Sequence, residues 1–294
     1  MSATAVADSS IVVAGAREEA DRAANAAGII VREIQGLDDV ERLSKVIDGV
    51  WGRQGRSIVS TDLALALAHS GNYVAAAFRD GTLLGGLVGF RAEADHGIDL
   101  YSHVMGVTTD ARSNGVGFAL KLHQRAWAMY EGLRTAGWTT DPLVRRNGYF
   151  NLAKLGASVE RYYPNFYGAM GDEINGVDDS DRILVLWRLD SERAISACQG
   201  RREEFDLERE LALGAEIALS VGPSGQPVGR AKASRPRRLL IQVPADIVSI
   251  RGQSPALARA WRRALREAMA AALNTGYETR GMTRSGHYVL GLPN

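Results

Sequence analysis

The residues best suited to chemistry form a polar loop between a predicted strand and a predicted long helix. The loop reads Val107-Thr-Thr-Asp-Ala-Arg112-Ser-Asn-Gly115-Val-Gly117. The first turn of a helix leaves backbone amides unpaired and carries about half a positive charge, so it attracts phosphate groups. Gly115 and Gly117 let an anion approach the backbone, and Arg112 adds a planar cation. The loop therefore predicts a cradle for a diphosphate.

Two common nucleotide-binding motifs do not fit this loop. The Rossmann fingerprint needs a third glycine where this chain has Leu120. The P-loop needs a lysine and a hydroxyl residue after its last glycine, where this chain has Phe118. The R-x-x-G-x-G pattern from Arg112 to Gly117 instead resembles the coenzyme A pyrophosphate loop of the GNAT superfamily, which comprises acyl-CoA-dependent N-acyltransferases.

The resemblance covers most of the chain from about residue 29 to residue 189, and more loosely the rest. Within the superfamily, the chain is similar to a bacterial family of acyltransferases. The matching motifs are Ser102-His103-Val-Met-Gly-Val107, Arg112-Ser-Asn-Gly-Val-Gly117, Trp138-Thr-Thr-Asp141-Pro-Leu143, Arg146-Asn147, Asn151-Leu-Ala-Lys-Leu155-Gly156, Tyr163-Pro-Asn-Phe-Tyr167-Gly168 and Asp181-Arg182.

The resemblance implies an α/β fold of the α+β type, in which helices flank a mixed, mostly antiparallel central sheet. We expect residues 1–28 to form a flexible tail or a marginal helix and residues 29–190 to form the GNAT-like catalytic domain. Residues 191–294 are expected to form a smaller C-terminal α+β subdomain. It has no second R-x-x-G-x-G, so we expect it to complete the acceptor pocket or to form a homodimer interface.

Local patterns predict the elements that position the loop. A strand over residues 29–34 precedes two helices, and the apolar runs 72–78 and 82–91 form a hairpin around Asp80-Gly81, a pair that tolerates positive φ. A further strand leads into the cradle and its helix. After the helix comes a short strand over residues 138–143, which is expected to run parallel to the strand that leads into the cradle.

The strand before the cradle is expected to alternate its side chains in the ordinary way. Tyr101, His103 and Met105 would lie on one face, and Ser102 and Val104 on the other. The resemblance implies that this strand and the strand after the long helix diverge. The pantetheine arm of the cofactor would then pair with exposed backbone around residues 105–109.

The resemblance implies that acetyl-CoA or another short acyl-CoA is used as a co-substrate. Whether the acyl group is acetyl, succinyl or another short group stays open. No metal cofactor is expected. The expected cofactor-binding residues are Val107, Thr109, Arg112, Asn114, Gly115, Val116, Gly117, Phe118 and Asn151.

Transfer to an amine requires a base, because an alkyl amine is mostly protonated near neutral pH. His103 is the first candidate base, because an imidazole ordinarily exchanges protons near neutral pH, although a hydrogen-bonded structural histidine is an equally good interpretation. Asp141 is a second candidate, either as base or as the partner of the substrate ammonium, and its alternative role is that of a turn former. The position usually held by the GNAT tyrosine is Leu152 here. Tyr149, Tyr163 and Tyr167 are the neighbouring candidates to replace it as the acid, and Tyr149 is our choice.

Four further residues are expected to contact the acceptor in the same region. They are Ser102, Arg146, Asn147 and Tyr167.

The composition and net charge of the chain limit the classes of partner that it can be expected to bind. The chain has 294 residues and a net charge of +1, which gives no general attraction to nucleic acid or membrane. The five basic residues over 230–238 lack interleaved aromatics and are interpreted as a solvated loop. The lone Cys198 excludes an internal disulfide and is expected to be a small buried residue. With no long apolar segment, we expect a cytoplasmic protein.

The sequence therefore predicts an acyl-CoA-dependent N-acyltransferase, most simply an acetyltransferase, that acts on a small metabolite or an amino acid. Two alternatives stay open. One is a degenerate GNAT domain that senses acyl-CoA without catalysis, which the missing tyrosine favours. The other is a modifier of proteins or tRNA, which the near-zero net charge disfavours for tRNA.

Overall fold

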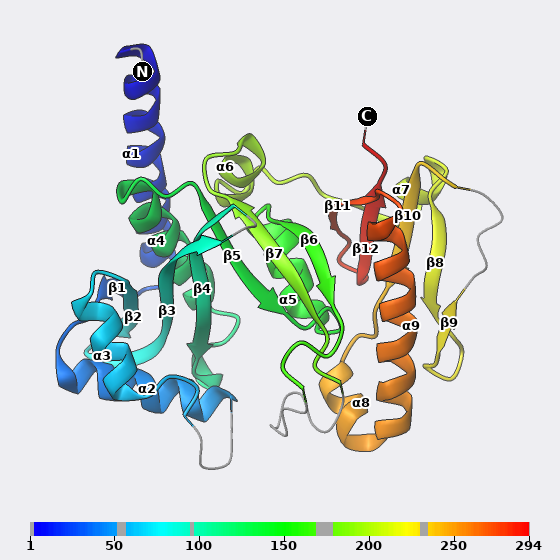
Figure 1. Ribbon diagram of the computed structural model, residues 1–294, viewed down its shortest axis with the longest axis horizontal. Helices are drawn as coiled ribbons and strands as arrows, with labels where there is room; N and C mark the ends of the chain where they lie inside the picture. Colours follow the sequence, from blue (N-terminus) through cyan, green and yellow to red (C-terminus); the bar gives the residue numbers. More distant parts are fainter. Residues whose placement is uncertain (1–2, 52–56, 95–96, 169–178, 230–234, 294) are drawn as a thin grey trace. The chain divides into compact units, whose positions relative to one another are not determined.

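The computed structural model describes residues 3–51, 57–94, 97–168, 179–229 and 235–293 (Figure 1). Its contacts divide the chain into two compact units, one of residues 1–138 with 188–191 and one of residues 139–187 with 192–294. The division falls at residue 138, whereas the sequence suggested a boundary near residue 190. Within the described ranges, no helix combines the length and the apolar character needed to cross a membrane.

Among its described residues, the first unit contains strands of one sheet and four α-helices. Its elements are α1 (Ala3–Ala26), β1 (Ile30–Glu33), α2 (Leu37–Trp51), α3 (Thr61–His69), β2 (Tyr73–Arg79), β3 (Thr82–Ala94), β4 (Ile98–Val107), the 3-10 turn η1 (Thr109–Ala111), α4 (Val116–Tyr130) and β5 (Thr135–Thr140). The strands lie in the order β1-β2-β3-β4-β5. The first four are antiparallel neighbours, and β5 runs parallel to β4. The predicted order of elements and the mixed α+β class are confirmed.

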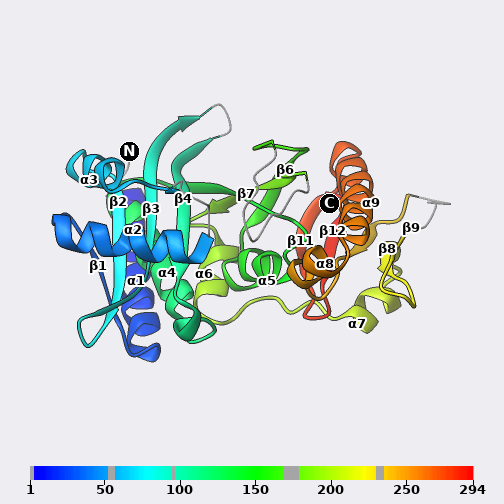
Figure 2. The same ribbon diagram turned by 90° about the horizontal axis from the view of Figure 1, so that it is seen from below.

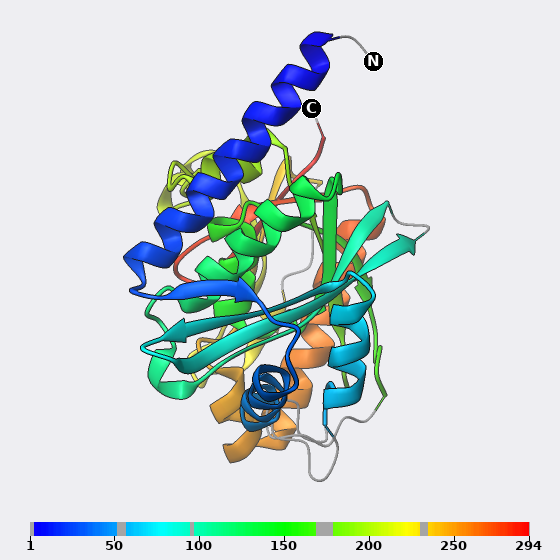
Figure 3. The same cartoon turned by 90° about the vertical axis from the view of Figure 1, so that its left-hand side faces the viewer.

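The two faces of this sheet are covered by different helices. Figure 2 shows α2 lying across the strands, and Figure 3 shows α1 and α4 on the opposite face from α2 and α3. Val88 and Val104 pack with α2 residues such as Leu43 on one face. Leu87 packs with Leu120 of α4 on the other. Alternate strand residues therefore supply two separate cores.

The predicted hairpin between β2 and β3 is confirmed. Asp80 and Gly81 both have positive φ, at 47° and 77°. Two consecutive left-handed residues match the right-handed twist of the flanking strands, which is why an Asp-Gly pair is favoured there. The N-cap of α3 is Ser60, whose side chain accepts a hydrogen bond from the Leu63 amide.

The N-terminal segment forms the helix α1, and its C-terminal part packs on α4. Ala16 and Ala20 are buried. Glu19 forms a buried ion pair with Arg125 of α4, with 2.5 Å between the carboxylate and the guanidinium. Because this pair lies in the interior, residues 16–26 belong to the first unit and are not a loose tail.

The second unit combines a strand pair with a separate five-stranded sheet. Its elements are α5 (Arg145–Tyr149), the π-helical turn η2 (Phe150–Lys154), β6 (Ser158–Tyr163), β7 (Arg182–Arg188), α6 (Glu192–Cys198), α7 (Leu207–Ala212), β8 (Glu216–Val221), β9 (Pro227–Gly229), β10 (Arg238–Gln242), α8 (Ile247–Gln253), α9 (Pro255–Asn274), β11 (Glu278–Met282) and β12 (His287–Gly291). β6 and β7 are antiparallel, and the larger sheet has the order β11-β12-β10-β8-β9. α6 and α7 are short helices of seven and six residues.

α9 is the longest helix of the second unit among the described residues, and it begins with a serine N-cap followed by a proline. Ser254 accepts a hydrogen bond from the Leu257 amide, and Pro255 occupies the first turn. Trp261 and Leu265 are fully buried. Cys198, expected to be a small buried residue, lies in the interior on α6. Of the basic stretch 230–238, residues 230–234 lie outside the described ranges.

Candidate functional site

The predicted cradle is a turn that leads from β4 into α4. Ser113 and Gly115 both have left-handed backbone, with φ of 68° and 82°. Gly115 is the N-cap of α4, and in the described part of the chain this position provides no side-chain cap for the first amides of that helix. These amides are therefore available to an external acceptor, and the helix dipole favours an anion there.

The side chains around the turn leave its surface open. Arg112, Asn114 and Gly115 are exposed, whereas Val116 is buried in the core beneath. A Cβ built on Gly117 would lie 3.5 Å from the Met105 methyl group and 3.8 Å from Val107 Cγ2, so a larger side chain at this position would fill the space between the first turn of α4 and the end of β4.

Most of the predicted cofactor-binding residues are brought together by this turn. They are Val107, Thr109, Arg112, Asn114, Gly115, Val116, Gly117 and Phe118. Asn151 is different, because it belongs to the second unit and is buried on η2.

Among the described residues, the backbones of β4 and β5 pair only near the N-terminal ends of the two strands. The register joins Leu100 to Ala136 and Tyr101 to Gly137, and no later pair between these strands is formed within the described residues. Beyond these pairs, β4 continues from Ser102 to Val107. Its backbone is the segment expected to meet the pantetheine arm.

A residue of α2 reaches this segment, which the sequence did not predict. The indole nitrogen of Trp51 donates a hydrogen bond to the Met105 carbonyl, with 3.2 Å between the two atoms. The carbonyl of Met105 is therefore satisfied from the helix side. No spacing in the sequence relates the end of α2 to the middle of β4, so this contact required the structure.

A β-bulge interrupts β4 beside the divergence. Val104 pairs with Val88 and Tyr101 with Phe90, so Ser102 and His103 together face the single residue Gly89. The predicted alternation is wrong here: Ser102 faces α4, while Val104 packs against α2 and α3. An extra residue in one strand shifts which face each side chain occupies.

The bulge also presents His103 at the surface. His103 is exposed, and its ring lies 5.9 Å from that of Phe90 and 6.4 Å from that of Tyr101. A bulge beside a ligand cleft is a common way to redirect a side chain. His103 is therefore accessible, as a general base must be.

Behind the bulge lies a buried polar cluster, here called the Lys121 cluster, formed by Lys121, Gln124, Ser102 and Trp138. The Lys121 ammonium donates to Ser102 Oγ at 2.8 Å and to Gln124 Oε1 at 3.3 Å. Ser102 Oγ donates to Gln124 Oε1 at 2.8 Å. The ammonium also lies 3.6 Å from the ring centre of Trp138. Burial lowers the pKa of Lys121 to about 7.

The structure assigns Asp141 to an ion-pair network within the second unit. The carboxylate is buried and accepts from both guanidinium nitrogens of Arg262, at 2.7 and 2.8 Å, and from Arg251 at 2.6 Å. These two arginines hold the pKa of Asp141 well below its usual range against the opposing effect of burial. A carboxylate held ionised by two cations is a poor proton acceptor, so its geometry favours a structural role over that of a base.

The remaining predicted residues also lie in the second unit. Arg146 is exposed and Asn147 half-buried on α5. Tyr167 is 47% exposed, and its hydroxyl lies 3.0 Å from the Thr139 hydroxyl. Leu152, at the position of the missing tyrosine, is buried.

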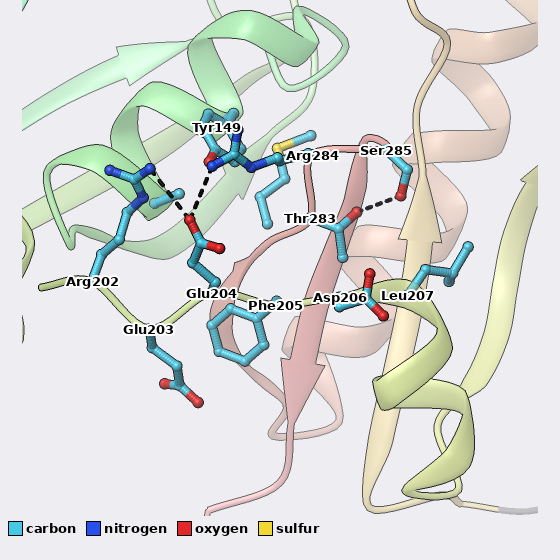
Figure 4. A pocket seen from close by; sticks show the side chains of 12 residues that line it. Tyr149, Arg202, Glu203, Glu204, Phe205, Asp206, Leu207, Thr283, Arg284 and Ser285 are labelled. Carbon is cyan, nitrogen blue, oxygen red and sulfur yellow. Dashed lines mark hydrogen bonds and ion pairs between the residues drawn. The ribbon is translucent and has the colours of Figure 1, made fainter. Parts of the chain in front are cut away.

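Tyr149 lines a pocket of about 230 Å³ in the second unit (Figure 4). Glu204 lies on its wall and accepts hydrogen bonds from Arg284 at 3.0 Å and Arg202 at 3.4 Å. At the β11–β12 turn, the hydroxyl of Ser285 lies 2.9 Å from that of Thr283. The pocket is lined by both apolar and charged side chains, and the charged ones are of both signs.

No protein-family model matches this chain, and no curated protein matches it. Solved structures similar to it are acetyltransferases. An acetyltransferase of the GNAT family from Streptococcus pneumoniae shares 15% identity, covers 54% of this chain and 98% of its own, and gives a TM-score of 0.43. Ard1 from Thermoplasma volcanium shares 17% identity over 54% of this chain and 96% of its own, with a TM-score of 0.42. The structure of yncA from Salmonella typhimurium with its cofactor acetyl-CoA shares 15% identity over 56% and 96%, with a TM-score of 0.44.

Proposed function

We propose that this protein is an acyl-CoA-dependent N-acyltransferase that transfers a short acyl group to the amine of a small metabolite or an amino acid. The observation that carries this proposal is the start of α4. There, a left-handed Gly115 and an exposed Arg112 precede a helix whose first amides no side chain caps. This is a site for a diphosphate, and it adjoins a strand whose outer backbone edge is unpaired with β5.

The two features suit the two halves of coenzyme A. The diphosphate would bind at the N-terminus of α4, where the helix dipole is positive, and to the guanidinium of Arg112. The pantetheine amides would pair with β4 beyond Tyr101, as an added strand does. The thioester is then directed along β4 toward Ser102 and His103.

The reaction requires an amine to lose its proton before it attacks the thioester carbon. The new C–N bond forms as the C–S bond breaks, and the thiolate leaves and takes up a proton. His103 is the proposed base, because it is exposed on the bulge of β4 and its type titrates near neutral pH. We keep Ser102, Arg146, Asn147 and Tyr167 as proposed acceptor residues, with Asn151 for the cofactor and Tyr149 as the proposed acid.

A second candidate function is an acyl-CoA sensor that lacks catalysis. One observation favours it: the position expected for the tyrosine acid is Leu152, whose side chain is buried. Binding without transfer to any member of a broad amine panel would favour the sensor.

Calorimetric titration of the purified protein with acetyl-CoA and free coenzyme A tests the site. The wild type should bind both, and Gly117→Trp should abolish binding by filling the first turn of α4. Gly252→Trp is the matched control, because Gly252 of α8 is exposed with open space around its Cβ direction. Unchanged affinity in Gly117→Trp would refute the cradle.

A further inference from the structure

The Lys121 cluster has more hydrogen-bond donors than acceptors. Gln124 Oε1 already accepts from both Lys121 and Ser102. Gln124 Nε2 is buried and has no hydrogen-bond partner among the described residues. A lysine ammonium and an amide NH₂ can only donate. When Lys121 is protonated, the cluster therefore lacks an acceptor for the Gln124 amide.

The cluster also lacks a counter-ion. Lys121 is 4% exposed, yet none of its contacts within the described ranges is with a carboxylate. Lysine is seldom buried without an acidic partner, because desolvation of an unpaired ammonium is costly. Its lowered pKa reflects burial alone. A group that supplies negative charge and two acceptor oxygens would satisfy both deficits.

The position of the cluster indicates where that group would come from. The last residues paired between β4 and β5 are Tyr101 and Gly137. Ser102 and Trp138 are the next residue on each strand, so the cluster lies at the closed end of the divergence. A pantetheine arm entering from the cradle brings its acyl group to this end.

We propose that Lys121 binds a carboxylate at the far end of the acyl group, so that the donor is a dicarboxylic acyl-CoA such as succinyl-CoA. This inference rests on the proposed function. The succinyl carboxylate is three bonds beyond the thioester carbon. It would accept from the Lys121 ammonium, as part of a charge-assisted pair in a water-poor site.

Succinyl-CoA and butyryl-CoA have acyl chains of equal length, and they differ in ending in a carboxylate or a methyl group. Titrations of the full chain with both, and with free coenzyme A, therefore isolate the contact. We expect succinyl-CoA to bind about tenfold tighter or more than butyryl-CoA. In Lys121→Met this ratio should fall to about one while the affinity for free coenzyme A stays unchanged. Lys121→Arg, which keeps the charge, should retain a preference.

A measurement on the wild type covers the case in which the variants do not fold. The contacts of Lys121 are Ser102 of β4, Gln124 of α4 and Trp138 of β5, and none of these side chains titrates near neutral pH. A bound carboxylate should raise the pKa of Lys121 from about 7. Titrations at pH 8 in two buffers of different ionisation enthalpy should show proton uptake with succinyl-CoA and none with butyryl-CoA.

The outcomes separate the two proposals. Binding of coenzyme A with equal affinity for the two acyl forms, or a preference that survives in Lys121→Met, would overturn the carboxylate site and leave the cradle intact. No binding of coenzyme A in any form would overturn the proposed function and the carboxylate site with it.

Discussion

Two buried charges, one in each unit, have opposite surroundings. In the second unit, Asp141 is enclosed by two guanidinium groups, and each oxygen of the carboxylate accepts at least one hydrogen bond from them. In the first unit, the Lys121 ammonium contacts only neutral groups within the described residues. Removing a partner from a compensated buried charge weakens the fold, whereas a charge that has only neutral partners weakens the fold as it stands and can recognise a ligand.

The largest effect is expected from breaking the Asp141 network. Arg262→Ala should lower the free energy of unfolding by about 3–5 kcal/mol, because it leaves a buried carboxylate short of one of its two cations. Arg259→Ala is the control, since Arg259 is exposed on the same helix. Urea denaturation measures both. A loss below about 1 kcal/mol in Arg262→Ala would mean that Arg251 alone compensates the charge.

Removing the buried lysine should have the opposite sign. Lys121→Met replaces an uncompensated amine by an apolar side chain of similar length, and it leaves the bond between Ser102 and Gln124 in place. We expect the free energy of unfolding at pH 7 without ligand to rise by about 1–2 kcal/mol. A clear destabilisation in the same denaturation assay would show that Lys121 stabilises the fold. The contrast between the buried charges of Asp141 and Lys121 would then be wrong.

The pH dependence of stability provides a sharper test of the same lysine. The pKa of Lys121 is about 7 in the folded chain against an ordinary 10.5, so between these values the unfolded chain binds more protons. Stability should therefore rise with pH across this window, by up to about 1.4 kcal/mol per pH unit from this group. Lys121→Met should remove that contribution, which is read as the difference between the two denaturation series.

The smallest effect is expected from a surface pair. Arg91 and Glu131 lie 2.5 Å apart, but their side chains are 46% and 33% exposed. Glu131→Gln should change the free energy of unfolding by less than about 1 kcal/mol, because water and salt screen such a pair. A loss in the free energy of unfolding as large as that of Arg262→Ala would show that burial does not determine how much each ion pair contributes to stability.

Local signals in the sequence were enough to predict the turn between β4 and α4 and the order of the elements around it. Gly115 is left-handed as expected, and the Asp80-Gly81 hairpin follows from its turn chemistry. These features depend on residues close together in the chain. The same is true of the Ser254 cap of α9.

The features that the sequence did not predict depend on distant partners. The bulge at Ser102 and His103 exists because β3 offers the single residue Gly89 opposite them. Lys121 and Arg262 each sit among apolar and polar neighbours on their helices, and nothing local indicates that they are buried. Their burial follows from which face of each helix meets the sheet.

Residues 188–191 belong to the first unit although they follow most of β7 in the sequence, and this affects how the protein can be truncated. The Leu189 amide donates to the Arg134 carbonyl at 2.9 Å, and the Leu189 carbonyl accepts from the buried Arg125 side chain at 2.7 Å. Neither unit is thus one continuous stretch of polypeptide. A fragment that stops at residue 138 would lack this short segment and leave the Arg125 guanidinium with an unmet hydrogen bond, so expression of either half from a single truncation should yield poorly behaved material.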